Sequence, residues 1–223
     1  LFIFEPLVQG ASGMRIYQPE VLDELINIAK SHQIVCIADE VMTGFGRTGK
    51  TFATDYLSNK PDIYCLSKGI TGGFLPMGVT SISGEIANSF DANDYAKTFF
   101  HGHSYTANPL ACAAAVESLK ILSKKSCQDQ IAMISASHQD FVAETAITSQ
   151  VKEINSLGTV LRIELKVDDP GYVSSKKEQI YDHFLAEGLL IRPLGHVIYI
   201  LPPYVIQKKE LRRIYAAIVR FLN

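Results

Sequence analysis

The sequence predicts an α/β protein, in which a mostly parallel sheet is followed by a compact α+β lobe. With 223 residues, 47% of them hydrophobic and 20% charged, the chain can bury the core of one large domain or two small ones. Short apolar runs alternate with polar or helical segments, which is typical of parallel strands covered on both faces. These runs span residues 1–4, 34–38, 63–66 and 79–82.

Two helices are predicted in the first half of the chain. Apolar residues between 21 and 29 recur at helical spacing, and Pro19 suits the first turn of that helix. This helix leads directly into the apolar run 34–38. Pro109 can open a second helix, which extends to Leu122.

The polar stretch 123–130 interrupts the helical pattern and marks a predicted domain boundary. Residues 1–122 would belong to a larger domain and residues 123–223 to a smaller C-terminal one. We expect the smaller domain to contain helix 131–147, strand 157–167, helix 174–187, strands 189–192 and 197–201, and helix 208–222.

Charge and composition argue against several classes of function. The net charge is −2, and lysine and arginine are scattered along the chain, so no basic surface for nucleic acid is expected. No apolar stretch reaches the roughly 18 to 20 residues that cross a membrane, and no signal region is visible. The four cysteines lack CxxC spacing. We expect a cytoplasmic protein without disulfides.

Asp39 and Lys68 each follow one of the apolar runs. Because the carboxyl ends of parallel strands meet at one edge of a sheet, we expect the two side chains to lie near each other. The cofactor pyridoxal 5'-phosphate (PLP) needs an amine to hold its aldehyde and a carboxylate to keep its ring nitrogen protonated. The pair therefore predicts a PLP site. The ordinary alternatives are an exposed loop lysine and an aspartate that caps a turn.

The glycine-rich segment 44–51 offers a competing interpretation. It matches the phosphate-binding pattern GxxxxGK[ST], and the run that ends in Asp39 and Glu40 resembles a magnesium-binding strand. However, a P-loop follows a strand directly and opens a helix, and its magnesium-binding strand comes later in the chain. Here the order is reversed, so a glycine-rich surface loop fits better than a nucleotide site.

Several motifs in order resemble the class III PLP-dependent aminotransferases. They occupy residues 37–41, 44–49, 61–69, 71–73, 101–105, 108–110 and 188–193. The resemblance implies a fold-type I PLP-dependent transferase, with part of the large PLP-binding domain in residues 1–122 and the small domain in residues 123–223. Because residues 1–4 already read as a strand, we expect a C-terminal fragment of a longer enzyme.

The resemblance assigns roles to individual residues. Lys68 would hold the cofactor aldehyde and then carry a proton between substrate and cofactor carbons, while Asp39 would pair with the ring nitrogen. Ser104 would reach the cofactor phosphate from the neighbouring subunit, which implies a homodimer with a shared active site; a loop serine fits the residues equally. Gly102 would lie close to the substrate. Arg192 would bind a substrate carboxylate with its planar guanidinium.

Further residues have lesser assignments. Tyr199 would line the substrate pocket, although a buried strand tyrosine that only packs its ring is equally consistent. Glu5 matches a glutamate near the active site of the family, and Arg47 an arginine of its glycine-rich loop. His101 and His103 form an HxH pair, but no cysteine or carboxylate lies nearby at ligand spacing, so no metal site is expected.

Residues 9–15 and 192–204 most resemble the family members that act in biotin synthesis. They imply a small-molecule amino donor, S-adenosylmethionine or lysine, and a keto acceptor, 8-amino-7-oxononanoate. An ω-amino-acid or ornithine-type transaminase is the alternative within the same chemistry. From another class, the alternatives are a non-catalytic fragment and a P-loop-like nucleotide binder.

Overall fold

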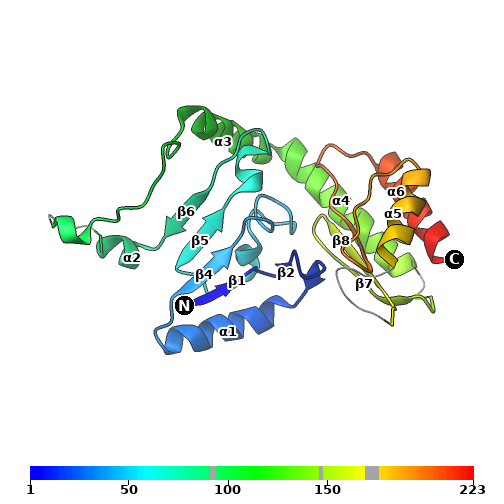
Figure 1. Cartoon of the computed structure of the whole chain (residues 1–223), viewed down its shortest axis with the longest axis horizontal. Helices are drawn as coiled ribbons and strands as arrows, with labels where there is room; N and C mark the ends of the chain where they lie inside the picture. Colours follow the sequence, from blue (N-terminus) through cyan, green and yellow to red (C-terminus); the bar gives the residue numbers. More distant parts are fainter. Residues whose placement is uncertain (91–93, 146–147, 169–175) are drawn as a thin grey trace. The chain divides into compact units, whose positions relative to one another are not determined.

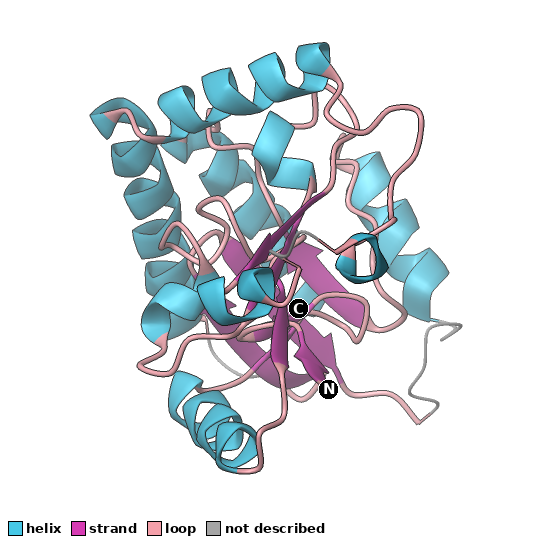
Figure 2. Cartoon of the chain, turned by 90° about the vertical axis from the view of Figure 1, so that its left-hand side faces the viewer, coloured by secondary structure: helices cyan, strands magenta, loops and turns pink. Residues whose placement is uncertain are grey.

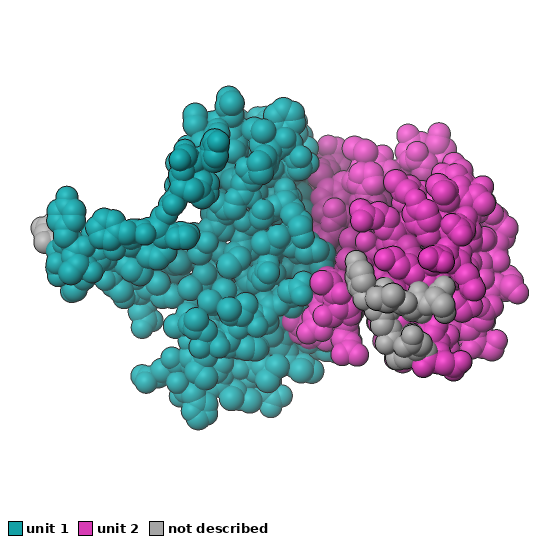
Figure 3. All heavy atoms as spheres, viewed as in Figure 1, with its two compact units in different colours: residues 1–7, 18–45, 51–124 teal, residues 8–17, 46–50, 125–223 magenta. Residues whose placement is uncertain are grey.

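The computed structural model of the protein describes residues 1–90, 94–145, 148–168 and 176–223. The chain forms two compact units, which are coloured separately in Figure 3. Unit 1 contains Leu1–Leu7, Gln18–Phe45 and Thr51–Lys124, and unit 2 contains Val8–Tyr17, Gly46–Lys50 and Lys125–Asn223. A single boundary after Leu122 was expected, whereas the structure assigns two short segments of the first half to unit 2.

Unit 1 is built on a four-stranded sheet with the order β1-β4-β5-β6 (Figure 1). Its strands are β1 (Phe2–Phe4), β4 (Cys36–Asp39), β5 (Ile63–Leu66) and β6 (Val79–Ile82). Both β1 and β5 pair with β4 in parallel, which confirms the mostly parallel sheet. β6 pairs with β5 in antiparallel fashion and forms one edge of the sheet.

Helices support this sheet and the turn that follows β5. Helix α1 (Pro19–Ser31) packs against β4, and its buried residues Leu22, Ile26 and Ala29 recur at helical spacing. Helix α3 (Pro109–Leu122) packs against the 3-10 helix η2 (Lys68–Thr71). The remaining helical segments of unit 1 are η1 (Ala53–Tyr56), α2 (Gly84–Asn88) and η3 (Tyr95–Lys97).

Unit 2 combines a three-stranded antiparallel sheet with three helices; Figure 2 shows the helices and strands of the chain in separate colours. The strands are β7 (Val151–Leu157), β8 (Val160–Leu165) and β9 (Val197–Ile200), and the helices are α4 (Lys125–Glu144), α5 (Lys176–Ala186) and α6 (Lys208–Leu222). Alternate residues of β8, among them Leu161 and Ile163, join a core with residues of all three helices. The helices therefore cover one face of this sheet.

The other face of this sheet carries a buried arginine. Arg162, whose side chain is 4% exposed, makes ion pairs with Glu153 and Glu164, each at 2.6 Å. Its Nε donates to the carbonyl oxygen of Gly13 at 2.7 Å. Gly13 lies between the paired strands β2 (Val8–Gln9) and β3 (Arg15–Ile16), so Arg162 joins this hairpin to β8.

Glu164 is held in its ionised form by this network. Burial acts to raise its pKa, but hydrogen bonds from Lys152, Arg162 and His196 outweigh burial and lower the pKa of Glu164 to about 2. Glu164 is thus ionised at neutral pH.

Several elements of the second half differ from the expectation. Helix α4 begins at Lys125, within the polar stretch, because lysine and glutamine are good helix formers and Lys125 pairs with Asp129 one turn later. Strand β7 was not expected, and β8 is the second arm of a hairpin. Residues 189–192 form no strand: Gly188 has φ 70° and Pro193 cannot donate to a ladder. Residues 146–147 and 174–175 of two expected helices lie outside the described residues.

No helix within the described ranges combines the length and apolar character needed to cross a membrane.

Candidate active site

The ends of β4 and β5 bring Asp39 and Lys68 to one edge of the unit 1 sheet. Asp39 is registered opposite Cys65, and the amide of Glu40 donates to the carbonyl oxygen of Cys65 at 3.0 Å. Lys68 begins η2, with only Ser67 between it and the last residue of β5. The carboxylate and the amine thus project from the ends of adjacent parallel strands.

Asp39 is half-buried and uses one of its carboxylate oxygens. Oδ1 accepts a hydrogen bond from the amide of Val41 at 3.0 Å. Burial, and then the negative charge of Asp39, raises the pKa of the Cys65 thiol, which lies opposite Asp39 on β5. No donor among the described residues reaches Oδ2. A partly buried carboxylate in this state favours a cationic hydrogen-bond donor.

Lys68 has a strained backbone and an available amine. Its φ of 42° lies in the left-handed region, which is rare for residues other than glycine. The carbonyl oxygen of Lys68 accepts from the amide of Gly73 at 3.3 Å, and the preceding Ser67 donates from Oγ to the carbonyl oxygen of Met77 at 2.7 Å. The side chain is exposed, and its ammonium has no partner within the part of the chain that the structure describes.

Glu40, which follows Asp39, shapes the site as a buried hydrogen-bond acceptor, a role that the sequence did not predict. It is fully buried, and its carboxylate accepts four hydrogen bonds. Oε2 accepts from Thr43 Oγ1 at 2.6 Å and from the Ala53 amide at 3.1 Å, while Oε1 accepts from the Thr54 amide and hydroxyl, both at 2.8 Å. Glu40 thereby fixes the loop that follows Asp39. Its only sequence signal was an acidic residue next to a buried strand.

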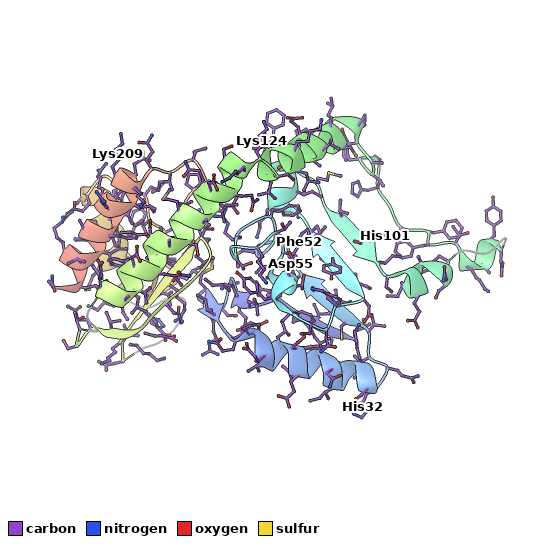
Figure 4. The ribbon with its side chains drawn as sticks, turned by 180° about the vertical axis from the view of Figure 1, so that it is seen from behind. His32, Phe52, Asp55, His101, Lys124 and Lys209 are labelled. Atoms are coloured by element: carbon purple, nitrogen blue, oxygen red, sulfur yellow. The ribbon has the colours of Figure 1, made fainter. Side chains whose placement is uncertain are left out.

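The glycine-rich segment 44–51 is a loop of turns and bends that opens no α-helix. The next element is the short η1, whose start is fixed by the Phe52 amide donating to Asp55 Oδ2 at 2.9 Å (Figure 4). A P-loop requires a strand before it and a helix after it. The nucleotide-binding interpretation of this segment is therefore wrong.

Arg47 stabilises unit 2. Its Nη1 donates to Thr159 Oγ1 at 3.2 Å and to the carbonyl oxygen of Pro202 at 3.0 Å, and its guanidinium lies 5.0 Å from the ring centre of Tyr204. The β7–β8 turn packs directly on this segment, because a Cβ on Gly158 would lie 2.1 Å from the backbone of Thr48. These contacts account for Arg47 without a substrate.

Gly102 and Ser104 lie on an exposed stretch between η3 and α3, which also carries His101 (Figure 4). His103 Nδ1 accepts from the amide of Tyr105 at 3.1 Å. Ser104 makes no hydrogen bond to other described residues. Within the described ranges, no three histidine, cysteine or acidic side chains are grouped as metal ligands.

Arg192 and Tyr199 belong to unit 2. Arg192 is exposed, and its guanidinium has no hydrogen bond or ion pair to any residue that the structure describes. Tyr199 is half-buried on β9, opposite Arg162 of β8. Glu5, which follows β1, is also half-buried.

The fold is that of the fold-type I PLP-dependent transferases. It is similar to the crystal structure of adenosylmethionine-8-amino-7-oxononanoate aminotransferase from Methanocaldococcus jannaschii, with a TM-score of 0.89 and 32% identity, covering 99% of this chain and 52% of that one. A family model described as aminotransferase class-III matches residues 2–222. The chain belongs to this family.

Two curated relatives show the range of similar proteins. The adenosylmethionine-8-amino-7-oxononanoate aminotransferase of Synechococcus elongatus is 42% identical over 224 residues, covering 99% of this chain and 52% of that protein. The omega-aminotransferase of Caulobacter vibrioides is 35% identical over 222 residues, covering 99% and 50%. The chain spans about half the length of the curated relatives it matches.

Class-III aminotransferases depend on PLP, and the residues at the strand ends fit this cofactor. The Asp39 oxygen that lacks a donor among the described residues suits a protonated ring nitrogen, and the exposed Lys68 amine suits the aldehyde. Both lie at the carboxyl edge of parallel strands, where open α/β sheets bind their ligands.

Proposed function

We propose that this protein is a PLP-dependent aminotransferase, which moves an amino group from a small-molecule donor to a keto acceptor. The observation that carries the proposal is the placement of Asp39 and Lys68 on adjacent strand ends, in a chain of the class-III aminotransferase family. The activity is proposed for the whole protein, because the chain covers about half of its relatives.

Asp39 and Lys68 have different roles towards the cofactor. Bound PLP supplies a ring that withdraws electrons from a substrate carbon. Asp39 Oδ2 keeps the ring nitrogen protonated through a charge-assisted hydrogen bond. The Lys68 amine anchors the aldehyde between reactions. When it does not hold the cofactor, the Lys68 amine would act as a base towards the amino-bearing carbon of the donor and would hold that proton on Nζ.

For the substrates we propose 8-amino-7-oxononanoate as acceptor, giving 7,8-diaminononanoate for biotin synthesis, and S-adenosylmethionine as donor. The names of the Synechococcus and Methanocaldococcus relatives support this choice. The acceptor carries a terminal carboxylate, and the exposed guanidinium of Arg192 is suited to bind it in two-pronged fashion. Gly102 and Tyr199 are proposed to contact the substrate.

We further propose a homodimer in the cytoplasm, with Ser104 donating to the cofactor phosphate of the neighbouring subunit. The support is the exposed apolar side chains that flank Ser104 along the chain, since unburied apolar groups favour contacts between proteins. They are Phe90, Tyr95, Phe99, Phe100, Tyr105 and Leu110, each at least 43% exposed. The cytoplasmic assignment is supported by four free thiols.

A second candidate is an ω-amino-acid transaminase, which the Caulobacter relative favours. The two candidates differ in the acceptor that discharges the aminated cofactor. Single-turnover absorbance with 8-amino-7-oxononanoate and with short ω-keto acids separates them. Discharge by the short acids alone would overturn the biotin-related substrate.

The cofactor chemistry is tested by adding PLP and recording the visible spectrum before and after borohydride. We expect a yellow species that borohydride fixes to Lys68, identified by peptide mass. Lys68→Ala should abolish it, while Lys120→Ala, an exposed lysine on α3, should retain it. Fixation at other lysines in equal yield would contradict the proposal.

A further inference from the structure

The residue after Lys68 rests directly on an aromatic ring. A Cβ placed on Gly69 would lie 2.8 Å from Cβ of Phe45 and 2.9 Å from its Cδ2. Atoms this close to the Phe45 backbone cannot swing away as the tip of a flexible side chain can. Phe45 is also 5% exposed, so it has little room to move. Only glycine fits at position 69 while the ring stays in place.

Strained backbone occurs on both sides of this contact, at Phe45 itself and at Lys68, which precedes Gly69. Phe45 has φ 58° and Lys68 has φ 42°, each in the left-handed region that residues with a side chain rarely adopt. Strained residues persist only where surrounding contacts impose their conformation. At Lys68, the contacts that impose this conformation are made by the next residue, Gly69.

Gly69 is held from two directions. The Phe45 ring lies on one side and is itself supported by Phe52, with ring centres 5.5 Å apart and edge-on geometry. The carbonyl oxygen of Gly69 accepts a hydrogen bond from Ser118 Oγ of α3 at 3.2 Å and another from the Gly72 amide at 3.0 Å. The turn that carries Lys68 is thus fixed between a ring and a helix.

The same contact connects Lys68 to Asp39 by a second route. The first route is the pairing of β4 with β5. The second route runs along the chain from Asp39 through Glu40, whose carbonyl oxygen accepts from the Gly44 amide at 3.0 Å, to Phe45 and then across to Gly69. Two independent connections fix the separation of a carboxylate and an amine better than one.

We propose that Phe45 is a positioning residue for Lys68: through its contact with Gly69, the ring sets where the amine stands relative to Asp39. The functional meaning of this role rests on the proposed use of Lys68 as the cofactor anchor. Phe45 itself touches no reacting atom in this proposal.

The test is a size-complementation cycle. Gly69→Ala forces the turn away from Phe45, and Phe45→Gly removes all three obstructing atoms, Cβ, Cγ and Cδ2, so the double variant should recover what Gly69→Ala loses. Phe45→Leu serves as a milder probe if Gly69→Ala folds poorly. Gly84→Ala is the matched control, since a Cβ there meets nothing within 4 Å.

Two readouts separate positioning from mere folding. The first is the NMR shift and titration of the isotope-labelled Lys68 amine in PLP-free protein, and the second is the dissociation constant for PLP. We expect Gly69→Ala to move the Lys68 signal and weaken PLP binding about tenfold or more, and the double variant to recover most of both, as coupled neighbours do. Gly84→Ala should match the wild type.

The proposal is overturned if the Lys68 signal is the same in all four proteins of the cycle, even where the urea midpoint changes. It is also overturned if the effects of Phe45→Gly and Gly69→Ala simply add. If the wild type does not bind PLP, the proposed function fails, while the Lys68 titration still decides whether Phe45 positions the amine.

Discussion

The amide of Glu40 donates to the carbonyl oxygen of Cys65 at 3.0 Å, so the ladder between β4 and β5 continues one residue past Asp39. The strand ends are therefore rigid at the point where Asp39 and Lys68 leave the sheet. Side chains that start from paired backbone hold a geometry better than side chains on free loops.

Replacing Asp39 with asparagine should weaken PLP binding about 10- to 100-fold, because a hydrogen bond to a charged group contributes roughly 1.5 to 3 kcal/mol. Asparagine keeps the shape but not the charge that holds a proton on the ring nitrogen. Absorbance titration with PLP measures the effect. Asp55→Asn, at the exposed start of η1, is the matched control. Equal affinity for both variants would refute the role of Asp39.

Replacing Glu40 with glutamine should destabilise the protein by about 3 kcal/mol. Each carboxylate oxygen accepts from one backbone amide, of Ala53 or of Thr54, so the glutamine NH₂ must oppose an N–H in either orientation. Urea unfolding provides the measurement. Glu117→Gln, on the exposed face of α3, should change stability little. An unchanged midpoint for Glu40→Gln would contradict the buried network.

Replacing Arg192 with alanine should raise the KM for the keto acceptor about 10- to 100-fold and change its kcat less. Lysine at position 192 should restore part of the affinity, because it keeps the charge but not the planar fork. Steady-state kinetics on the whole protein tests this, with Arg212→Ala, a change at an exposed arginine of α6, as control. For an acceptor whose carboxylate is converted to an amide, wild type and Arg192→Ala should have the same KM. A difference in KM for this acceptor would show that Arg192 does not act on the carboxylate.

Stability should fall in mild acid because of His138. Burial lowers the pKa of this fully buried residue to about 4, and its Nδ1 lies 2.7 Å from the Tyr215 hydroxyl. In the unfolded chain, His138 becomes protonated as the pH falls below about 6.5. In the folded chain, it becomes protonated only near pH 4. The contribution of His138 to the free energy of unfolding is therefore complete above pH 6.5 and is lost as the pH falls towards 4. At pH 5 this loss amounts to about 2 kcal/mol.

Urea unfolding at pH 7.5 and at pH 5 measures this loss. His138→Gln should flatten the dependence, since glutamine does not titrate, while His32→Gln, at the exposed end of α1 (Figure 4), should retain it. Glu164 titrates in a lower window, because its pKa is lowered to about 2 and its contribution is lost only below about pH 4.5. Parallel slopes for wild type and His138→Gln would remove His138 as the cause.

The sheet of unit 1 was predictable because its strands are local apolar runs; β5 and β6 occupy the expected ranges. Strand β7 of unit 2 was not predictable, because Lys152, Glu153 and Asn155 break the apolar pattern. That strand depends on partners across the sheet, such as the pairing of Lys152 with Glu164 at 2.7 Å. Sequence periodicity does not contain such distant partners.

The candidate site was likewise predictable from the sequence only in part. Asp39 and Lys68 could be found because each follows a strand and carries a group that one cofactor requires. Glu40 and Phe45 could not, since their roles depend on the backbone amides of Ala53 and Thr54 and on the approach of Gly69. Arg47 was matched by resemblance to an arginine of the family's glycine-rich loop, and its contacts with Thr159, Pro202 and Tyr204 could not be predicted from the sequence.

The contact between Gly158 and Thr48 affects how this protein can be divided. Unit 2 is assembled from three separate stretches of chain, so cutting between Lys124 and Lys125 does not release a self-sufficient module. The excised piece would lose Gly13 as partner of Arg162 and the 46–50 backbone on which Gly158 rests. Chimeras between related enzymes should therefore exchange all three stretches together, and a crossover at the apparent linker alone should give insoluble protein.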